Sequence, residues 1–270
     1  MNQETAARPL QHVLLTGAAS GIGAECARKL RARGVRITAL DIAEPATAVD
    51  HFCTLDLADA PSIERAVAFA LTRGPFDALL NIAGIPPRPG QELKVLTVNW
   101  LGQRQLTEGV LDGLNAGGAI VNMASRAGAQ WRDNLEQVKA LIASEDAAAM
   151  QSLIDAGAVD ATRAYNLSKE AMIVWSIALT EQLKSRELRV NSVSPAAVDT
   201  GILDDFKTAF GERVAQNIAR VGRPGRPDEI ADLALFLASP ESHWIRGMDI
   251  VIDGGMGAMI QSDVLGLSSS

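Results

Sequence analysis

The stretch HVLLTGAASGIG, residues 12–23, decides the fold of this 270-residue chain. Its first five residues are mostly apolar, which predicts a buried strand over 12–16, and we expect a helix from Gly23 to Arg33. Glycines between a strand and a helix let the backbone turn tightly and approach a pyrophosphate, whose charge the helix N-terminus then holds. Such loops also serve as plain turns, but this position directly between strand and helix favours dinucleotide binding.

An acidic residue ends the second predicted strand. Asp41 follows the glycine loop by about 20 residues, the spacing at which an acid accepts hydrogen bonds from the ribose hydroxyls of NAD. The same carboxylate would repel the extra phosphate of NADP. Arg36 lies within the strand, away from the place of a phosphate-binding arginine. Asp41 could instead be a solvated residue at a strand end, but with the glycine loop upstream the sequence favours NAD as cofactor.

Short apolar runs alternate with helical segments along the chain. Strands that are apolar on both faces and alternate with helices predict a parallel sheet covered on both sides. We therefore expect an α/β fold, a single Rossmann-type, doubly wound domain over residues 1–270. The expected strands are 12–16, 35–40, 77–81, 119–123, 189–194 and 248–252, and the clearest helices are 23–33, 62–71, 94–114 and 165–184.

Two segments interrupt this alternation. Residues 132–158 are polar and alanine-rich, with apolar residues at helical spacing, which predicts one or two extra helices inserted before the helix of Tyr165. Residues 201–225 are interpreted as a mobile helical flap over the substrate, and they end in Gly-Arg-Pro-Gly.

Composition and charge exclude several classes of function. Hydrophobic residues make up 47% and charged residues 21%, and the formal net charge is -7, which argues against nucleic acid or an anionic membrane as a partner. The two cysteines, Cys26 and Cys53, form no disulfide framework, and no spacing of cysteine and histidine predicts a metal site. With no signal peptide or membrane-spanning run, we expect a cytoplasmic protein.

Tyr165 and Lys169 lie four residues apart, on one face of a predicted helix. A phenol with a pKa of about 10 is a poor base at neutral pH. A nearby ammonium, together with a positive nicotinamide ring, would favour the phenolate. The same spacing also fits an exposed pair on a helix surface. The pair therefore predicts catalysis only when other motifs accompany it.

Further motifs accompany this pair along nearly the whole chain. They are Thr16–Gly23, Leu55-Asp56-Leu57, Asn81-Ile82-Ala83-Gly84, Val98-Asn99-Trp100-Leu101-Gly102, Val121–Ser125, Tyr165–Lys169, Pro195–Thr200 and Asp253-Gly254-Gly255. Together they resemble the short-chain dehydrogenase/reductase family. The resemblance implies an NAD-dependent enzyme that moves a hydride between the cofactor and an alcohol or carbonyl group.

The resemblance also implies a role for each matched residue. Ser125 would hydrogen-bond the substrate oxygen, and Tyr165 would exchange a proton with it. Lys169 would lower the pKa of Tyr165 and hold the nicotinamide ribose, while Asn99 would anchor a water that passes the proton outward. Asp56 would touch the adenine ring. The residues expected to bind the cofactor are Gly17, Ser20, Gly21, Ile22, Gly23, Asp41, Asp56, Leu57, Asn81, Ala83, Gly84, Tyr165, Lys169, Pro195, Val198 and Thr200.

The chain departs from the family pattern at two places. Ala196 stands where glycine is usual, so the loop beside the nicotinamide is expected to shift slightly. Tyr165 also follows Ser125 much later than in most members, because of residues 132–158. Such an insertion is similar to the bacterial coniferyl-alcohol dehydrogenase and 3α-hydroxysteroid dehydrogenase/carbonyl reductase branch of the family.

The resemblance to that branch implies an apolar, aromatic or cyclic alcohol or ketone as substrate. A carbonyl reductase acting mainly on ketones or quinones is the alternative, and a non-catalytic NAD-sensing module is a more distant one. We also expect a homodimer or homotetramer, with the C-terminal strand as one contact. Substrate-pocket candidates, each of which could equally pack in the core or a loop, are Pro86, Pro87, Trp131, Ile202, Leu203 and Phe206.

Overall fold

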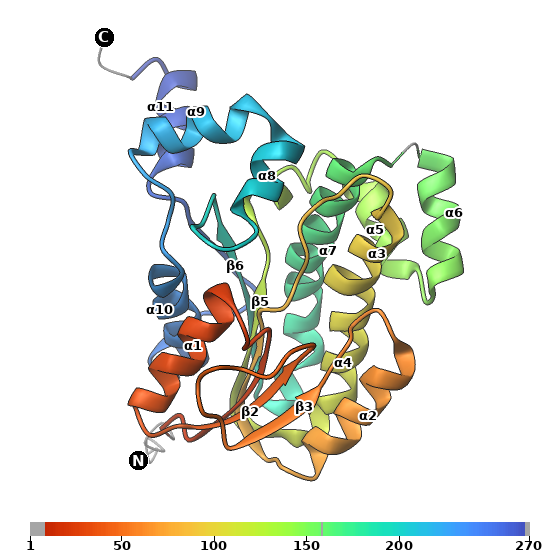
Figure 1. The fold of residues 1–270 in the computed structure, drawn as a ribbon, viewed down its shortest axis with the longest axis vertical. Helices are drawn as coiled ribbons and strands as arrows, with labels where there is room; N and C mark the ends of the chain where they lie inside the picture. The colour runs from red at the N-terminus through yellow and green to blue at the C-terminus, as the bar shows by residue number, and fades with distance from the viewer. Residues whose placement is uncertain (1–8, 158, 268–270) are drawn as a thin grey trace.

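The computed structural model describes residues 9–157 and 159–267, which form a parallel sheet between two layers of helices (Figure 1). The strand order is β3-β2-β1-β4-β5-β6-β7, and every pair of neighbours is parallel. This is the doubly wound sheet that the alternating pattern predicts. The strands are β1 His12–Thr16, β2 Arg36–Asp41, β3 His51–Thr54, β4 Phe76–Asn81, β5 Leu114–Met123, β6 Arg189–Pro195 and β7 Asp249–Ile252.

The central strands are buried on both faces, which explains their continuous apolar runs. In β1, Val13 and Leu15 belong to one core and Leu14 belongs to the core on the other face of the sheet. Strand β3 has no such run, because its four residues, His-Phe-Cys-Thr, mix polar and apolar side chains and are only partly buried. For that reason the sequence pattern does not predict β3, which pairs with the edge of β2.

The helices form two layers (Figure 1). Helices α1 (Gly21–Ala32) and α10 (Pro227–Ala238) contact one another on one face, and α2 (Ala60–Leu71), α4 (Gly102–Val110) and α7 (Ala161–Gln182) cover the other. The helix expected over 94–114 is divided. It begins as α3 (Glu92–Leu96), continues through a π-helical turn η1 (Thr97–Leu101) and then becomes α4, followed by the short turn η2 (Leu111–Gly113).

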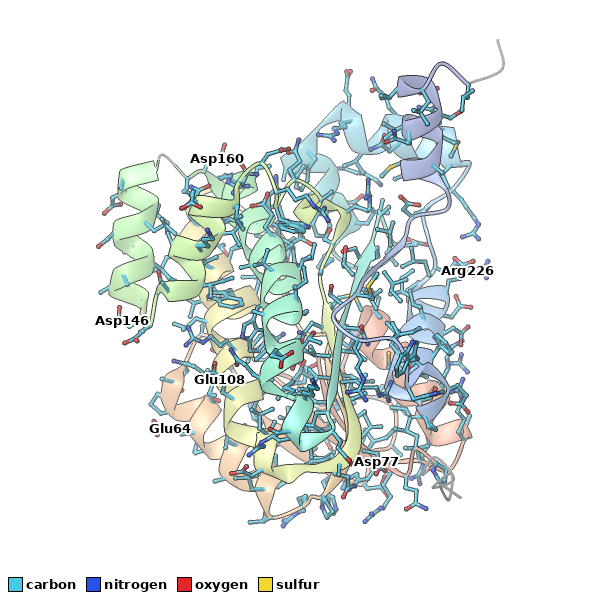
Figure 2. The ribbon with its side chains drawn as sticks, turned by 180° about the vertical axis from the view of Figure 1, so that it is seen from behind. Glu64, Asp77, Glu108, Asp146, Asp160 and Arg226 are labelled. Carbon is cyan, nitrogen blue, oxygen red and sulfur yellow. The ribbon has the colours of Figure 1, made fainter. Side chains whose placement is uncertain are left out.

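Two helices lie between β5 and α7, beyond the 3-10 turn η3 (Arg126–Gly128). They are α5 (Leu135–Ala143) and α6 (Ala147–Gly157), and each directs apolar side chains at the core, among them Val138 and Met150. Asp146 accepts a hydrogen bond from the Ala149 backbone at the start of α6 (2.8 Å). Asp160 caps α7 by accepting from the Arg163 backbone (2.7 Å). Figure 2 shows both carboxylates from behind.

Three helices lie beyond the carboxyl ends of the strands (Figure 1). Helices α8 (Leu203–Phe210) and α9 (Glu212–Val221) fall within 201–225, and α11 (Met256–Val264) follows β7. Gly211 separates α8 from α9 with a φ of 63°, which favours glycine. The mobility expected of 201–225 stays a prediction. Two further 3-10 turns are η4 (Lys184–Arg186) and η5 (Pro240–Ser242).

None of the helices that the structure describes is both long and apolar enough to cross a membrane.

Gly102, at the start of α4, packs directly against the backbone of the segment that follows β3. A Cβ at this position would lie 2.2 Å from the carbonyl oxygen of Leu57. We expect Gly102→Ala to lower the free energy of unfolding by about 1–3 kcal/mol, because backbone must move to admit the methyl group. Urea unfolding measures this change.

Gly201 is the matched control, because a Cβ there would meet nothing within 4 Å. Gly201→Ala should change the stability by no more than about 0.5 kcal/mol. Equal stability of the two variants would show that the Leu57 contact is not a constraint.

Candidate active site

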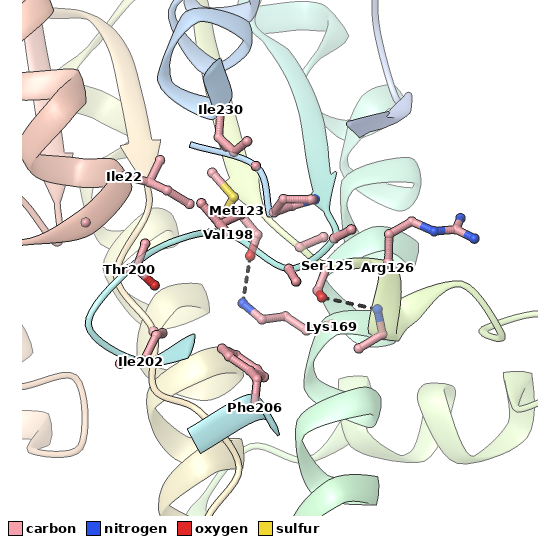
Figure 3. A pocket seen from close by; sticks show the side chains of 18 of the residues that line it. Ile22, Met123, Ser125, Arg126, Lys169, Val198, Thr200, Ile202, Phe206 and Ile230 are labelled. Atoms are coloured by element: carbon pink, nitrogen blue, oxygen red, sulfur yellow. Dashed lines mark hydrogen bonds between the residues drawn. The ribbon is translucent and has the colours of Figure 1, made fainter. Parts of the chain in front are cut away.

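A cleft of about 1030 Å³ lies at the carboxyl ends of the strands and extends from the glycine loop to α8, α9 and α11. Ligands of open α/β sheets bind at this edge. Figure 3 shows part of its lining. The predicted site residues that line it are Gly17, Ser20, Gly21, Ile22, Gly23, Asp41, Asp56, Leu57, Ala83, Gly84, Ser125, Tyr165, Lys169, Pro195, Val198, Thr200, Ile202 and Phe206.

The glycine loop is packed so closely that only glycine fits at two positions. Gly17 has a φ of 75°, and a Cβ there would lie 2.7 Å from the Ala83 backbone nitrogen. A Cβ on Gly23 would lie 1.9 Å from the Gly17 carbonyl oxygen. Ser20 stands at the N-cap of α1 without a side-chain capping bond, so the first-turn N–H groups open onto the cleft. Such a helix N-terminus fits a pyrophosphate.

Two carboxylates line the same part of the cleft. Asp41 Oδ2 accepts a hydrogen bond from the Ala19 backbone (2.8 Å), which joins the end of β2 to the glycine loop. Asp56 Oδ1 accepts one from the Ala58 backbone (2.8 Å). Each carboxylate keeps lone pairs for a ligand, since an ionised carboxyl group can accept about four hydrogen bonds. The residues present therefore fit a dinucleotide with its ribose hydroxyls near Asp41.

Asn81 and Asn99 support the wall of the cleft from behind. Asn81 Nδ2 donates to Thr107 Oγ1 (2.8 Å) and to Asn122 Oδ1 (2.9 Å), so its side chain is occupied in the core. Asn99 lies in the π-helical turn η1, a feature that often marks functional sites. Its amide bonds both the backbone N–H (2.8 Å) and the carbonyl (2.9 Å) of Ile85. Neither side chain lines the cleft, and Asn99 instead fixes the loop after β4.

Ser125, Tyr165 and Lys169 come together at the middle of the cleft. The Tyr165 phenol is hydrogen-bonded to the side chain of Ser125. Lys169 Nζ lies 5.6 Å from the centre of the Tyr165 ring and donates to the Met123 carbonyl (2.8 Å). Ser125 Oγ accepts from the Ala127 backbone (3.1 Å), and Figure 3 shows this bond together with that of Lys169.

Burial dominates the electrostatics of this group. It raises the pKa of Tyr165 to about 12, which the hydrogen bond with Ser125 opposes. It also lowers the pKa of Lys169 to about 8. We expected Lys169 to lower the pKa of Tyr165, but desolvation by burial is the larger effect, so the phenol is protonated at neutral pH. A positive charge brought by a ligand would favour the phenolate.

Aromatic and aliphatic side chains line the far end of the cleft. The Phe206 ring lies edge-on to Tyr165 at 5.1 Å, and the Phe210 ring at 6.3 Å. Sequence reasoning identified Phe206 but not Phe210. It also missed the apolar face of α9, although spacing within 201–225 could have indicated it. The apolar residues of α9 and α11 that line the cleft are Val214, Ile218, Val221, Met256 and Ile260.

The remaining pocket candidates do not line the cleft. Trp131 packs against the core, with the Arg132 guanidinium over its ring at 4.1 Å. Leu203 is buried, as are Pro86 and Pro87. Within residues 9–157 and 159–267 no cluster of three histidine, cysteine or acidic side chains could hold a metal ion.

Comparisons with known proteins agree with this architecture. A family model described as short chain dehydrogenase matches residues 11–140, and one described as enoyl-(acyl carrier protein) reductase matches residues 136–257. The chain is 37% identical to a coniferyl-alcohol dehydrogenase of Pseudomonas sp. (strain HR199 / DSM 7063) over 90% of this chain and 95% of that protein. It is 30% identical to the 3-alpha-hydroxysteroid dehydrogenase/carbonyl reductase of Comamonas testosteroni over 92% and 97%.

A solved structure is also similar over nearly the whole chain. The 3-alpha-hydroxysteroid dehydrogenase of Pseudomonas sp. B-0831, complexed with NADH, superposes with a TM-score of 0.83 at 30% identity. The match covers 93% of this chain and 99% of that one. The seven-stranded parallel sheet and the family models agree with the family that the sequence motifs predict. The chain belongs to the short-chain dehydrogenase/reductase family.

Proposed function

We propose that this protein is an NAD-dependent oxidoreductase that interconverts an apolar, aromatic or cyclic alcohol and its carbonyl compound. The observation that carries the proposal is that Ser125, Tyr165 and Lys169 open into the same cleft as the glycine loop and Asp41. The activities of the similar coniferyl-alcohol and 3-alpha-hydroxysteroid dehydrogenases support it. The cytoplasmic location expected from the sequence stays a prediction.

The proposed cofactor site spans the first half of the cleft. The N-terminus of α1 would hold the pyrophosphate, and Asp41 the adenosine ribose. The relative of known structure that binds NADH supports this cofactor. When bound, NAD⁺ would accept the hydride from the alcohol carbon. Asp41 would also disfavour NADP through like-charge repulsion.

Side chains of this protein would transfer the proton of the substrate hydroxyl. Ser125 would donate a hydrogen bond to the substrate oxygen and orient it, while Tyr165 accepts the hydroxyl proton during oxidation and returns it during reduction. Lys169 supplies positive charge beside the phenol ring, where exclusion of water strengthens its effect. Because burial raises the pKa of Tyr165, the share of phenolate grows as pH rises, and we expect the rate of oxidation to rise from neutral pH until Lys169, whose pKa burial lowers to about 8, loses its positive charge.

The far end of the cleft determines the proposed class of substrate. Ile202, Phe206 and Phe210 line it, and the rings of Phe206 and Phe210 lie edge-on to Tyr165. Rings of this kind bury apolar area efficiently and stack against other rings. This lining supports an aromatic or alicyclic alcohol. The same residues serve the reduction of a ketone, so a carbonyl reductase uses the same geometry.

We also propose a homodimer that is formed through the β7 edge of the sheet. Strand β7 is the last strand of the described sheet, and edge strands favour pairing with another chain. Apolar side chains are exposed there and nearby, which supports an interface between two copies. They are Trp244, Met248 and Val251.

Replacement of Tyr165 by phenylalanine separates an enzyme from an NAD-sensing module. We expect Tyr165→Phe to lower kcat for alcohol oxidation by about 10²- to 10⁴-fold, because the group that accepts the proton is lost. NAD should bind with unchanged affinity. The assay is NADH formation with coniferyl and cinnamyl alcohols, 3-hydroxysteroids and cyclic alcohols.

Wild-type turnover of one of these classes would support the proposal. If the wild-type protein binds NAD but oxidises none of these alcohols, the proposed substrate class is rejected. Undiminished oxidation by the Tyr165→Phe variant would reject the catalytic assignment.

Removal of the Asp41 carboxylate tests the choice of cofactor. Asp41→Ser should reduce the preference for NAD over NADP, measured as the ratio of kcat/KM values, by at least about tenfold, since a like-charge contact costs several kcal/mol. Asp199→Ser is the matched control, because Asp199 is exposed and does not line the cleft. An unchanged ratio in the Asp41 variant would refute the assignment.

Introducing a charged side chain beside β7 tests whether the dimer forms through this surface. Trp244 is 87% exposed, and Trp244→Glu should convert a dimeric wild-type protein to monomer in sedimentation or light scattering. Leu71→Glu is the control, because Leu71 is 44% exposed on α2, at the opposite edge of the fold. A wild-type protein that is monomeric at micromolar concentration contradicts the proposal.

A further inference from the structure

A buried carboxylate on the outer side of α7 belongs to none of the groups described so far. Glu170 follows Lys169 in the chain, and its side chain is only 1% exposed. Burial of a charge costs several kcal/mol unless hydrogen bonds replace the lost water. Here the side chains of Arg163 and Asn134 supply those bonds.

Three donors surround Glu170. Arg163 binds it in a bidentate manner, with nitrogen–oxygen distances of 2.9 and 2.6 Å. Asn134 Nδ2 donates to Glu170 Oε1 at 2.8 Å. Arg163 Nε in turn donates to Gln137 Oε1 at 2.8 Å. Asn134 stands at the start of α5 and Gln137 within it, so this network joins the inserted helix to α7.

The network holds α7 at both ends of its catalytic turn. Arg163 lies two residues before Tyr165, and Glu170 lies one residue after Lys169. The segment that carries the phenol and the ammonium is therefore bracketed by two side chains tied to α5. Since the backbone of a helix is stiff over one or two turns, fixing residues 163 and 170 fixes the residues between them.

The same network reaches back to Ser125. The chain passes from Ser125 through the turn η3, where a Cβ on Gly128 would lie 2.9 Å from the Lys169 carbonyl carbon and 3.0 Å from the Glu170 nitrogen. It then reaches Gln130, whose carbonyl accepts bonds from the backbone and side-chain nitrogens of Asn134 (both 3.2 Å). A continuous set of contacts thus connects Ser125 with the far side of α7.

We propose that Glu170 is a positioning residue, which together with Arg163, Asn134 and Gln137 sets the distance between Ser125 and Tyr165. The first inserted helix then acts on the reaction by holding the proton-transfer geometry, without touching the substrate. This inference rests on the proposed function. Misplacement of a reacting group by about 1 Å can cost about 100-fold in rate, which makes such a restraint effective.

Glu170→Gln and Asn134→Ala are the test variants. The first keeps the shape of the side chain and removes its charge, and the second removes one donor while leaving the Arg163 ion pair intact. Glu136→Gln is the matched control, because Glu136 lies on the same inserted helix, is 88% exposed and pairs only with the exposed Lys139 among the described residues. Measurements on each protein are kcat, KM, the Kd for NAD⁺ and the melting temperature.

A spectroscopic readout reports on the site without turnover. Tyr165 is the only tyrosine of the chain, so tyrosinate absorbance in the near ultraviolet belongs to it alone. The hydrogen bond with Ser125 lowers the pKa of Tyr165. In NAD⁺-saturated protein we therefore expect Glu170→Gln to raise the titration midpoint, because the Ser125 contact is loosened.

We expect Glu170→Gln to lower kcat by about tenfold or more, with the Kd for NAD⁺ within about twofold of the wild type. Asn134→Ala should change kcat and the midpoint in the same direction but less, and Glu136→Gln should change neither. Lower melting temperatures with wild-type kcat and a wild-type tyrosinate midpoint would overturn the proposal and leave a purely stabilising role. If the wild-type protein oxidises no alcohol, the proposed function fails, and the tyrosinate midpoints alone decide this inference.

Discussion

Parallel pairing of the strands is the constraint on which the rest of this molecule depends. Because β1, β2, β4, β5 and β6 run in the same direction, their carboxyl ends meet at one edge of the sheet. The glycine loop after β1, Asp41 at the end of β2, the loop after β4, Ser125 after β5 and Pro195 at the end of β6 thereby share one cleft. Buried threonine and asparagine side chains maintain this edge: Thr16 Oγ1 accepts from the backbones of Ile82 (3.0 Å) and Ala83 (3.1 Å).

Burial gives the reactive group its character. Tyr165 and Lys169 are 6% and 5% exposed, so each is held in the neutral form more strongly than in water. The folded protein thus disfavours phenolate until pH rises far above 10, and it disfavours ammonium as pH rises through about 8. A positive charge beside the phenol would oppose the first preference.

Much of the fold and of the site follows from the sequence, for definite physical reasons. Strands buried on both faces produce continuous apolar runs, and the glycines of the loop are required by contacts that admit no side chain, as at Gly23. Strand β3 gave no signal, because a short, half-exposed edge strand needs no continuous apolar run. The π-helical turn at Asn99 escaped notice, since it alters hydrogen bonding within an otherwise helical pattern. Trp131 lies outside the cleft because an apolar residue after a strand can as readily pack inward. Nothing in the sequence indicates the network of Arg163 and Glu170, because it depends on Asn134 and Gln137, which the fold brings beside α7.

The location of α8 and α9 has a consequence for how the protein diverges. These helices lie outside the three-layer sandwich, and α9 contributes no fully buried residue. Substitutions on α9 avoid the cost of repacking the core, whereas the backbone contacts of Gly17 and Gly23 tolerate no added atom. The apolar wall that α9 contributes to the cleft can therefore change its side chains at little cost in stability, while the backbone around the glycine loop cannot. Residues of α9 are thus the part of the cleft that is freest to vary in shape.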